Sequence, residues 1–179
     1  MRTFAITALS FGALVLAITG CAKAPVTGPE RLQVGDIAPS FILTTVDGSD
    51  EIVSGKVIQD NLGMVVIFWS MTCPTCREAL AACEGVYEQY GKMSMAFVGI
   101  NFDQENLQGV RAFVKGENIK FPNVWDPGAR ITRAYRAFDY TFSVFVADKT
   151  GKLVLVQYDH PPDLAARLSK ALDGLLAKQ

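Results

Sequence analysis

The chain has 179 residues, of which half are hydrophobic, and it carries a formal net charge of −1 at pH 7. This composition is typical of a compact globular protein and argues against a disordered chain. The sequence contains no basic run of the kind that binds nucleic acid, so we expect no nucleic-acid partner.

The first twenty residues have the features of an export signal. Arg2 supplies a positive charge, residues 4–17 form an apolar segment too short to span a membrane, and the tetrad ITGC follows at 18–21. The tetrad resembles the lipobox of bacterial lipoproteins, in which the cysteine becomes the acylated first residue. We therefore expect a lipid on Cys21. An ordinary secretory signal is the alternative, and both interpretations export the protein.

The next segment, residues 21–33, contains two prolines and a glycine with few apolar residues. This composition predicts an extended tether. The remaining residues, 34–179, are enough for one domain with one hydrophobic core. We therefore predict a lipoprotein signal peptide at 1–20, a tether at 21–33 and a domain at 34–179 that is held at a membrane surface in the cell envelope.

The first predicted elements lead to a pair of cysteines. Segments 41–46 and 52–53 flank an Asp-Gly turn and predict an amino-terminal β-hairpin. Residues 64–69 form a continuous apolar run, typical of a strand buried on both faces of a sheet. Residues 76–90 have helical periodicity that ends at a glycine. The sequence thus predicts a strand, a turn and a helix in succession, with the cysteines at their junction.

The second half of the chain continues the α/β pattern. We predict a strand at 95–100, helices at 107–114 and 126–137, a hairpin of strands at 143–147 and 152–156, and a last helix that starts at Pro161 and Pro162. A βαβ unit, a hairpin and a closing helix together predict an α/β fold with a mixed central sheet flanked by helices.

Cys73 and Cys76 lie three positions apart at the predicted start of a helix. Side chains at this spacing face the same side, and a small adjustment brings them within disulfide distance. The unsatisfied N–H groups and the positive end of the helix favour a thiolate at Cys73, so Cys73 is the expected nucleophile and Cys76 the resolving thiol. Pro74 suits a first helical turn because its missing N–H is not needed there. Thr75 adds a hydroxyl and little bulk.

The segment VVIFWSMTCPTCREAL resembles the active-site segment of the thioredoxin superfamily, and in particular the membrane-tethered thiol-disulfide oxidoreductases of the TlpA/ResA type, within the redoxin (AhpC/TSA) superfamily. The segments VGDIAPSFIL, VGINFDQE and VFVADKTGKLV extend the resemblance over roughly residues 32–157. The resemblance implies a thioredoxin-like fold with the hairpin as an addition, and no bound cofactor or metal. It also implies exchange of electrons with cysteines of exported proteins, and a membrane thiol-relay protein as electron donor.

Two positions depart from this family's pattern. The family's cis-proline falls at Phe142, and no proline occurs at 129–159, so we expect a trans peptide bond before Phe142 and an altered docking edge. The glutamate often found three residues after the second cysteine is replaced by Ala79, with Glu78 one position earlier. A helix rotates by about 100° per residue, so we expect Glu78 to face solvent, and we keep it as a candidate supporting residue.

Three alternatives stay open. Copper chaperones of the Sco type also lack the proline, but their histidine falls at Tyr140. Peroxiredoxins share a Cys-Pro-Thr tripeptide, but their proline and threonine before the cysteine are replaced by Val66 and Ser70. A tethered binding module could keep the disulfide for structure alone. Of the residues outside the pair, we expect Cys83 in the core and His160 at the surface or as a helix cap.

Overall fold

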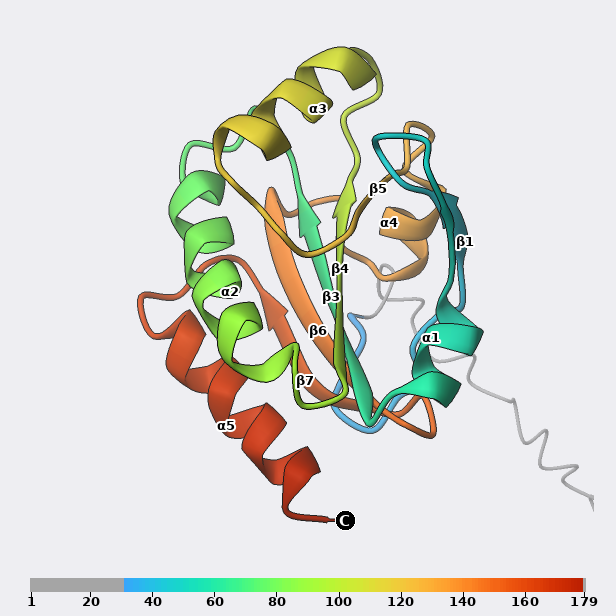
Figure 1. The fold of residues 1–179 in the computed structure, drawn as a ribbon, viewed down its shortest axis with the longest axis vertical. Helices are drawn as coiled ribbons and strands as arrows, with labels where there is room; N and C mark the ends of the chain where they lie inside the picture. The colour runs from blue at the N-terminus through green and yellow to red at the C-terminus, as the bar shows by residue number, and fades with distance from the viewer. Residues whose placement is uncertain (1–30, 179) are drawn as a thin grey trace, which may run out of the picture.

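The computed structural model describes residues 31–178 (Figure 1). The predicted signal peptide (1–20), Cys21 and most of the predicted tether (21–33) lie outside the described residues. Between residues 31 and 178, no helix has both the length and the apolar character needed to cross a bilayer.

A mixed five-stranded sheet forms the centre of the molecule, as predicted. Its strands follow the order β5-β4-β3-β6-β7, with β3, β4 and β5 parallel to one another and β6 antiparallel to both β3 and β7. The strands are β3 (Gly63–Trp69), β4 (Met95–Asn101), β5 (Asn123–Trp125), β6 (Phe142–Asp148) and β7 (Leu153–Tyr158).

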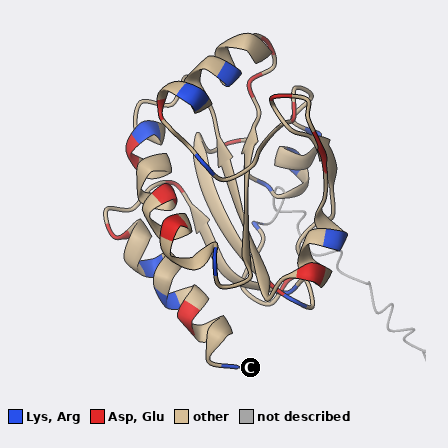
Figure 2. Ribbon diagram, viewed as in Figure 1, with Lys and Arg blue, Asp and Glu red and all other residues tan. Residues whose placement is uncertain are grey.

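Helices cover both faces of this sheet (Figure 1). One face packs against α2, α3 and α5, and the other against α1 and α4. The helices are α1 (Ser54–Asp60), α2 (Cys76–Tyr90), α3 (Leu107–Gly116), α4 (Arg130–Ala134) and α5 (Leu164–Leu176). Figure 2 shows charged residues of both signs on the outward surfaces of α2 and α5, which fits helices that bury only one side.

The central strand β3 explains why the core has two halves. All seven of its residues are buried, as its continuous apolar run predicts. Successive side chains of a strand point to opposite faces, so Val65, Ile67 and Trp69 enter the core under α2 and α5. Their neighbours in the strand enter the core under α1 and α4. The strand therefore ends in the core beneath the start of α2.

The amino-terminal hairpin is present as predicted. Strands β1 (Ile42–Thr44) and β2 (Glu51–Val53) pair antiparallel around the Asp47-Gly48 turn, where Gly48 has a φ of 78°. That positive φ is the reason for a glycine at this position. Thr45 forms an isolated bridge with Val124, which joins the hairpin to the β5 edge of the main sheet.

The structure corrects the predicted helix at 126–137, which is shorter. The helix α4 starts only at Arg130 because the Asp126 carboxylate accepts hydrogen bonds from the N–H groups of Arg130 and Thr132, at 3.0 and 2.9 Å. It ends at Ala134, and Arg136 follows with a φ of 57°. Two elements were not predicted at all, the seven-residue helix α1 and the three-residue strand β5.

Candidate redox site at the start of helix α2

Cys73 and Cys76 form a disulfide, with their Cα atoms 5.3 Å apart. Cys76 is the first residue of α2, and Cys73 lies in the tight turn before it, where the Cys76 N–H donates to the Cys73 carbonyl at 3.3 Å. Cys73 is 6% exposed and Cys76 only 1%. A partner molecule therefore reaches the sulfur of Cys73 first.

The start of α2 provides an electrostatic reason for reactivity. The N-cap residue Thr75 makes no side-chain capping bond, so no capping side chain neutralises the N–H groups of the first turn. The Thr75 hydroxyl lies 3.7 Å from the Cys73 sulfur, on the side where it can donate to a thiolate. Negative charge on the Cys73 sulfur is thus favoured in the reduced protein.

The opposite wall of the site comes from the start of β6. The Thr141 carbonyl oxygen lies 3.1 Å from the Cys76 sulfur and can accept a hydrogen bond from its thiol in the reduced state. The next residue, Phe142, is buried and pairs with Trp69 of β3. The peptide bond before Phe142 is trans, as expected, because residues 31–178 contain no cis peptide bond. The Phe142 side chain lies in the same core cluster as both cysteines, and the backbone before it supplies the carbonyl that contacts Cys76.

Sequence reasoning missed the carboxylate that holds the loop before Cys73. Asp103 accepts hydrogen bonds from the Ser70 hydroxyl and, at 2.9 Å, from the Met71 N–H. Its second oxygen also accepts from the Asn101 side-chain amide at 2.8 Å, and that amide is fully buried. The signal was present in the sequence, since polar residues directly follow a strand that is otherwise buried.

Trp69, at the end of β3, forms the floor of the site. Its indole N–H donates to the Asn123 side-chain oxygen at 3.0 Å, and its ring stacks on Phe113 at a centroid distance of 5.2 Å. Gly99 leaves room for this bond, because a Cβ at that position would come within 2.2 Å of the Asn123 oxygen. The tryptophan is a buried packing residue with its one polar atom satisfied.

Three candidate supporting residues lie at the surface around the pair. Pro74, Thr75 and Glu78 are all exposed. Glu78 faces solvent in the first turn of α2, as the helical rotation predicts. Its carboxylate therefore adds negative charge at the start of the helix, and no contact among the described residues holds it against the cysteine sulfurs.

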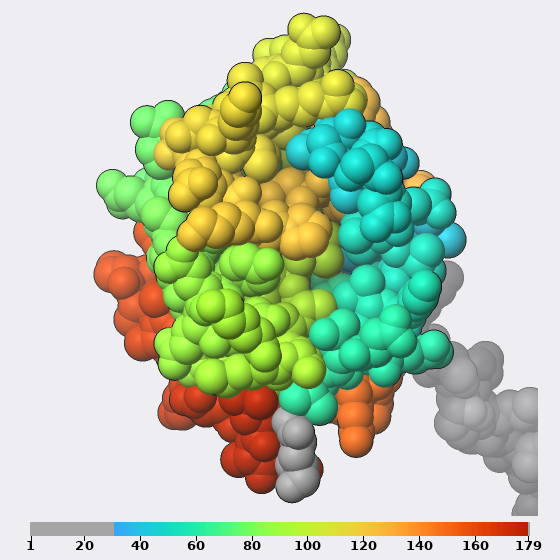
Figure 3. Space-filling view, in the orientation of Figure 1, coloured from blue at the N-terminus to red at the C-terminus, as the bar shows by residue number. Residues whose placement is uncertain are grey.

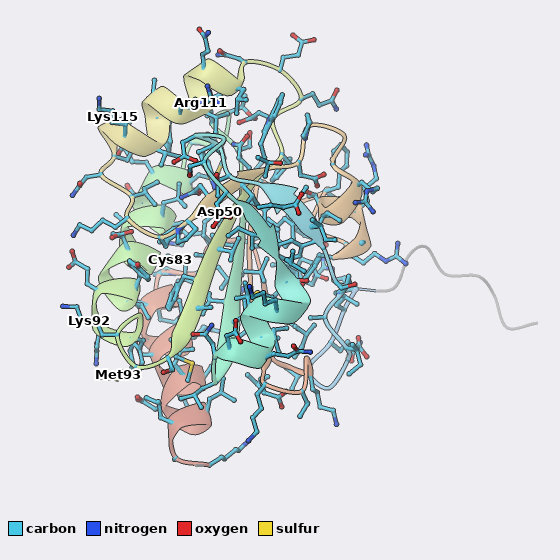
Figure 4. All side chains as sticks on the ribbon, turned by 45° about the vertical axis from the view of Figure 1, so that its right-hand side comes forward. Asp50, Cys83, Lys92, Met93, Arg111 and Lys115 are labelled. Atoms are coloured by element: carbon cyan, nitrogen blue, oxygen red, sulfur yellow. A yellow bond between two sulfur atoms is a disulfide. The ribbon has the colours of Figure 1, made fainter. Side chains whose placement is uncertain are left out.

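Cys83 lies in the interior of the same helix. It is fully buried, and burial raises the pKa of its thiol to about 12. Figure 4 labels this residue on α2. The prediction of a core role is confirmed, and at neutral pH this thiol stays protonated.

His160 and Tyr140, the residue at the position of the copper chaperones' histidine, both pack against aromatic rings. The His160 ring faces the Phe142 ring at a centroid distance of 6.0 Å, and the N-cap of α5 is Asp163. Of the two roles expected for His160, the capping role is therefore wrong, and the residue is half-buried near the surface. Tyr140 packs on Tyr158 with ring centroids 4.7 Å apart. Within the part of the chain that the structure describes, no three His, Cys, Asp or Glu side chains are grouped as metal ligands.

One pocket lies away from the cysteines. It has a volume of about 580 Å³ and lies between the β1–β2 hairpin and α3, two segments that meet at the face shown in Figure 3. Asp50, Arg111 and Lys115 line it, as Figure 4 shows from another side. Arg111 donates from its Nε to the Val46 carbonyl, so this side chain fastens the hairpin to α3.

The fold and the site define a class of protein: a thioredoxin-like α/β protein whose Cys-X-X-Cys pair starts the helix after the central strand. A family model described as "AhpC/TSA family" matches residues 34–156. The chain therefore belongs to the AhpC/TSA family.

Individual relatives agree with this assignment. The chain is 27% identical to the thiol-disulfide oxidoreductase ResA of Bacillus thuringiensis over 129 residues, which cover 72% of this chain and 71% of that protein. It is 29% identical to the thiol peroxidase of Aquifex aeolicus over 143 residues, covering 74% and 81%. The crystal structure of a thiol:disulfide interchange protein from Chlorobium tepidum superposes with a TM-score of 0.66 at 25% identity, covering 79% and 97%.

Proposed function

We propose that the protein is a thiol-disulfide oxidoreductase that reduces disulfides of exported proteins, with Cys73 as nucleophile and Cys76 as resolving thiol. The observation that carries this proposal is the disulfide at the start of α2, in which Cys73 is the more exposed of the two residues, at 6% against 1%. The similarity to ResA and to a thiol:disulfide interchange protein supports the same chemistry.

The proposed reaction is a pair of sulfur exchanges. The Cys73 thiolate of the reduced protein attacks one sulfur of the partner's disulfide, which forms a mixed disulfide and releases the partner's other sulfur as a thiolate. Cys76 then attacks the Cys73 sulfur, which closes the Cys73–Cys76 disulfide and releases the partner's second thiol. The partner gains two electrons and two protons, and the protein loses them. No cofactor is needed, because electrons pass only between sulfur atoms.

The similarity to a thiol peroxidase makes peroxide reduction the second candidate function. The residues before Cys73 argue against it. Val66 is buried within β3 and Ser70 is bonded to Asp103, at the two positions where a peroxiredoxin carries proline and threonine. The sulfur of the resolving residue Cys76 is already bonded to Cys73, and this arrangement favours disulfide exchange over peroxide reduction.

The proposed location is the outer side of a bacterial membrane, with the domain held there by acyl chains on Cys21. The export signal at 1–20 and the tetrad that ends at Cys21 support this proposal. Several acyl chains anchor a protein firmly, because each buried methylene contributes about 0.8 kcal/mol. In this location the electron donor is a thiol-relay protein of the membrane, and the substrates are exported proteins with cysteines.

The test is to trap the mixed disulfide with the full-length Cys76→Ser variant. Incubation with a synthetic peptide that contains one intramolecular disulfide should give a stable covalent adduct on Cys73, seen as a mass increase that dithiothreitol reverses. The matched control is Cys83→Ser, which should reduce the peptide without accumulating an adduct. Rapid consumption of hydrogen peroxide by the unmodified protein, with no adduct in the variant, would contradict the proposal in favour of a peroxidase.

A further inference from the structure

A second pocket lies on the far side of the loop that contacts Cys76. Its volume is about 300 Å³, and it is formed by the end of α4, the loop before β6 and the first described residue of the chain. Its lining is rich in arginine and aromatic side chains: Arg31, Arg133, Arg136, Phe138, Asp139 and Tyr140.

Two of the arginines are held over aromatic rings. The Arg133 guanidinium lies 4.0 Å from the centre of the Phe138 ring and donates to the Gly128 carbonyl at 2.7 Å. The Arg31 guanidinium lies 4.8 Å from the centre of the Tyr140 ring. These contacts fix the positions of the guanidinium groups without neutralising their charge. The pocket is therefore arranged for an anion before any ligand arrives.

The charge of the pocket is unbalanced. Three guanidinium groups face one carboxylate, that of Asp139. The salt bridges between residues 31 and 178 use cations outside the pocket, namely Arg77, Lys120 and Arg167. A planar guanidinium binds a carboxylate through two parallel hydrogen bonds, so an acidic side chain suits this pocket in both charge and shape.

Two contacts connect the lining of the pocket to the loops around the disulfide. Tyr140 directly precedes Thr141, whose carbonyl oxygen lies 3.1 Å from the Cys76 sulfur. On the other side, the Phe138 ring lies 6.4 Å from the ring of Phe102, whose N–H donates to the carbonyl of Trp69 at 3.3 Å. The loop before β6 therefore lies at the same end of the sheet as Cys73, where a bound peptide can extend towards the arginines.

We propose that this pocket binds an Asp or Glu side chain near the reacting cysteine of the partner protein, and so selects acidic segments as substrates. The inference rests on the proposed function, because it names the feature by which that same site would recognise its partner. Anionic lipid is the competing occupant, but Tyr140 of the pocket is followed directly by Thr141, which contacts the Cys76 sulfur, so we commit to a partner protein that reacts at the disulfide.

The test compares two synthetic peptides with the same intramolecular disulfide, one with two glutamates next to a cysteine and the other with two glutamines. The full-length reduced protein should process the acidic peptide with a kcat/KM about tenfold higher at low salt, and the ratio should approach one in 0.5 M NaCl (about a 4 Å Debye length). In the Arg133→Gln/Arg136→Gln variant the ratio should fall to about one at low salt. The control Arg130→Gln, on the same helix but outside the pocket, should keep the ratio of the unmodified protein.

The outcomes separate the two proposals. Reduction of both peptides at equal rates by the unmodified protein would overturn this inference alone. Reduction of neither peptide would overturn the proposed function and the inference together. The double variant is also compared with the unmodified protein for binding to vesicles of phosphatidylglycerol, with phosphatidylcholine vesicles as the neutral control. If the variant keeps the tenfold ratio but loses binding to the phosphatidylglycerol vesicles alone, the pocket binds lipid, and the inference is wrong.

Discussion

The start and the interior of helix α2 hold the same side chain in two environments. Cys76 begins the helix and shares a disulfide with Cys73, whereas Cys83 lies two turns further along and is enclosed by the core. The helix start favours negative charge on sulfur, and the core opposes it strongly enough to raise the pKa of Cys83 to about 12. Position on one helix therefore separates a reactive pair of cysteines from a packing residue.

The largest expected effect comes from removing the reactive thiol at the helix start, compared with removing the buried thiol in the helix interior. Cys73→Ser should lower the rate of peptide disulfide reduction by at least about a thousandfold, because a hydroxyl is not ionised at neutral pH and cannot start the exchange. The rate is measured by the release of thiols from a disulfide peptide. Cys83→Ala is the control and should stay within about twofold of the unmodified protein. A larger loss in the control than in Cys73→Ser would break the comparison.

The buried thiol of Cys83 should instead affect how the free energy of unfolding depends on pH. The folded pKa of Cys83 is raised above the ordinary 9.0, so the folded state keeps a proton that the unfolded state loses above pH 9. Its contribution is therefore fully present below pH 9 and declines as the pH rises towards 12, by about 1.4 kcal/mol per pH unit.

Urea unfolding between pH 8 and pH 11 measures this decline. The starting protein carries Cys73→Ala and Cys76→Ala, which removes disulfide exchange in the unfolded chain. Addition of Cys83→Ala should lower the free energy of unfolding by a constant amount below pH 9, and it should flatten the pH slope of that free energy above pH 9. Parallel curves with and without Cys83 would show that the thiol ionises normally in the folded state.

A smaller effect should come from the loop that positions Cys73. Asp103→Asn removes the charge that holds the Ser70 hydroxyl and the Met71 N–H, and hydrogen bonds to a charged group contribute about 1.5–3 kcal/mol. We expect the exchange rate to fall about tenfold. Asp148→Asn is the matched control, because its carboxylate holds a turn at the opposite end of the sheet. A similar rate loss in both variants would mean that general destabilisation is responsible.

The smallest effect is expected for Glu78. The carboxylate is exposed, so Glu78→Gln should change the exchange rate by less than about twofold and stability by about 0.3–1 kcal/mol through the helix dipole. Thermal unfolding and the peptide assay measure the two quantities. A rate loss beyond tenfold would instead make Glu78 a proton carrier for the pair.

The sequence was informative where a pattern is long and repeated. The buried strand β3 and the helix α2 follow from continuous apolar residues and from a helical period that runs to Tyr90. The short elements α1 and β5 were missed because seven and three residues are too few to establish a period. The truncation of α4 depends on the Asp126 side chain, whose bonds to Arg130 and Thr132 exist only in the folded loop.

The residues of the site likewise fall into those that the sequence identified and those that only the fold brings together. Cys73 and Cys76 were identifiable because spacing and helix position alone define their chemistry. The polar residues after β4 are a signal that could have marked Asp103 as a candidate, but its role could not be assigned, since its partners Ser70 and Met71 lie more than thirty residues away in the sequence. The arginine pocket combines Arg31 with the end of α4, two segments that only the fold brings together.

The floor of the site has a practical consequence. The chain contains two tryptophans, and both lie around the cysteine loop: Trp69 packs in the same core cluster as the disulfide, and Trp125 donates from its indole to the Asp103 carbonyl at 2.7 Å. Disulfides quench excited indole rings on contact, whereas free thiols do so less. The emission of these two residues should therefore brighten on reduction, and the protein carries its own optical indicator of how many molecules in a sample are oxidised.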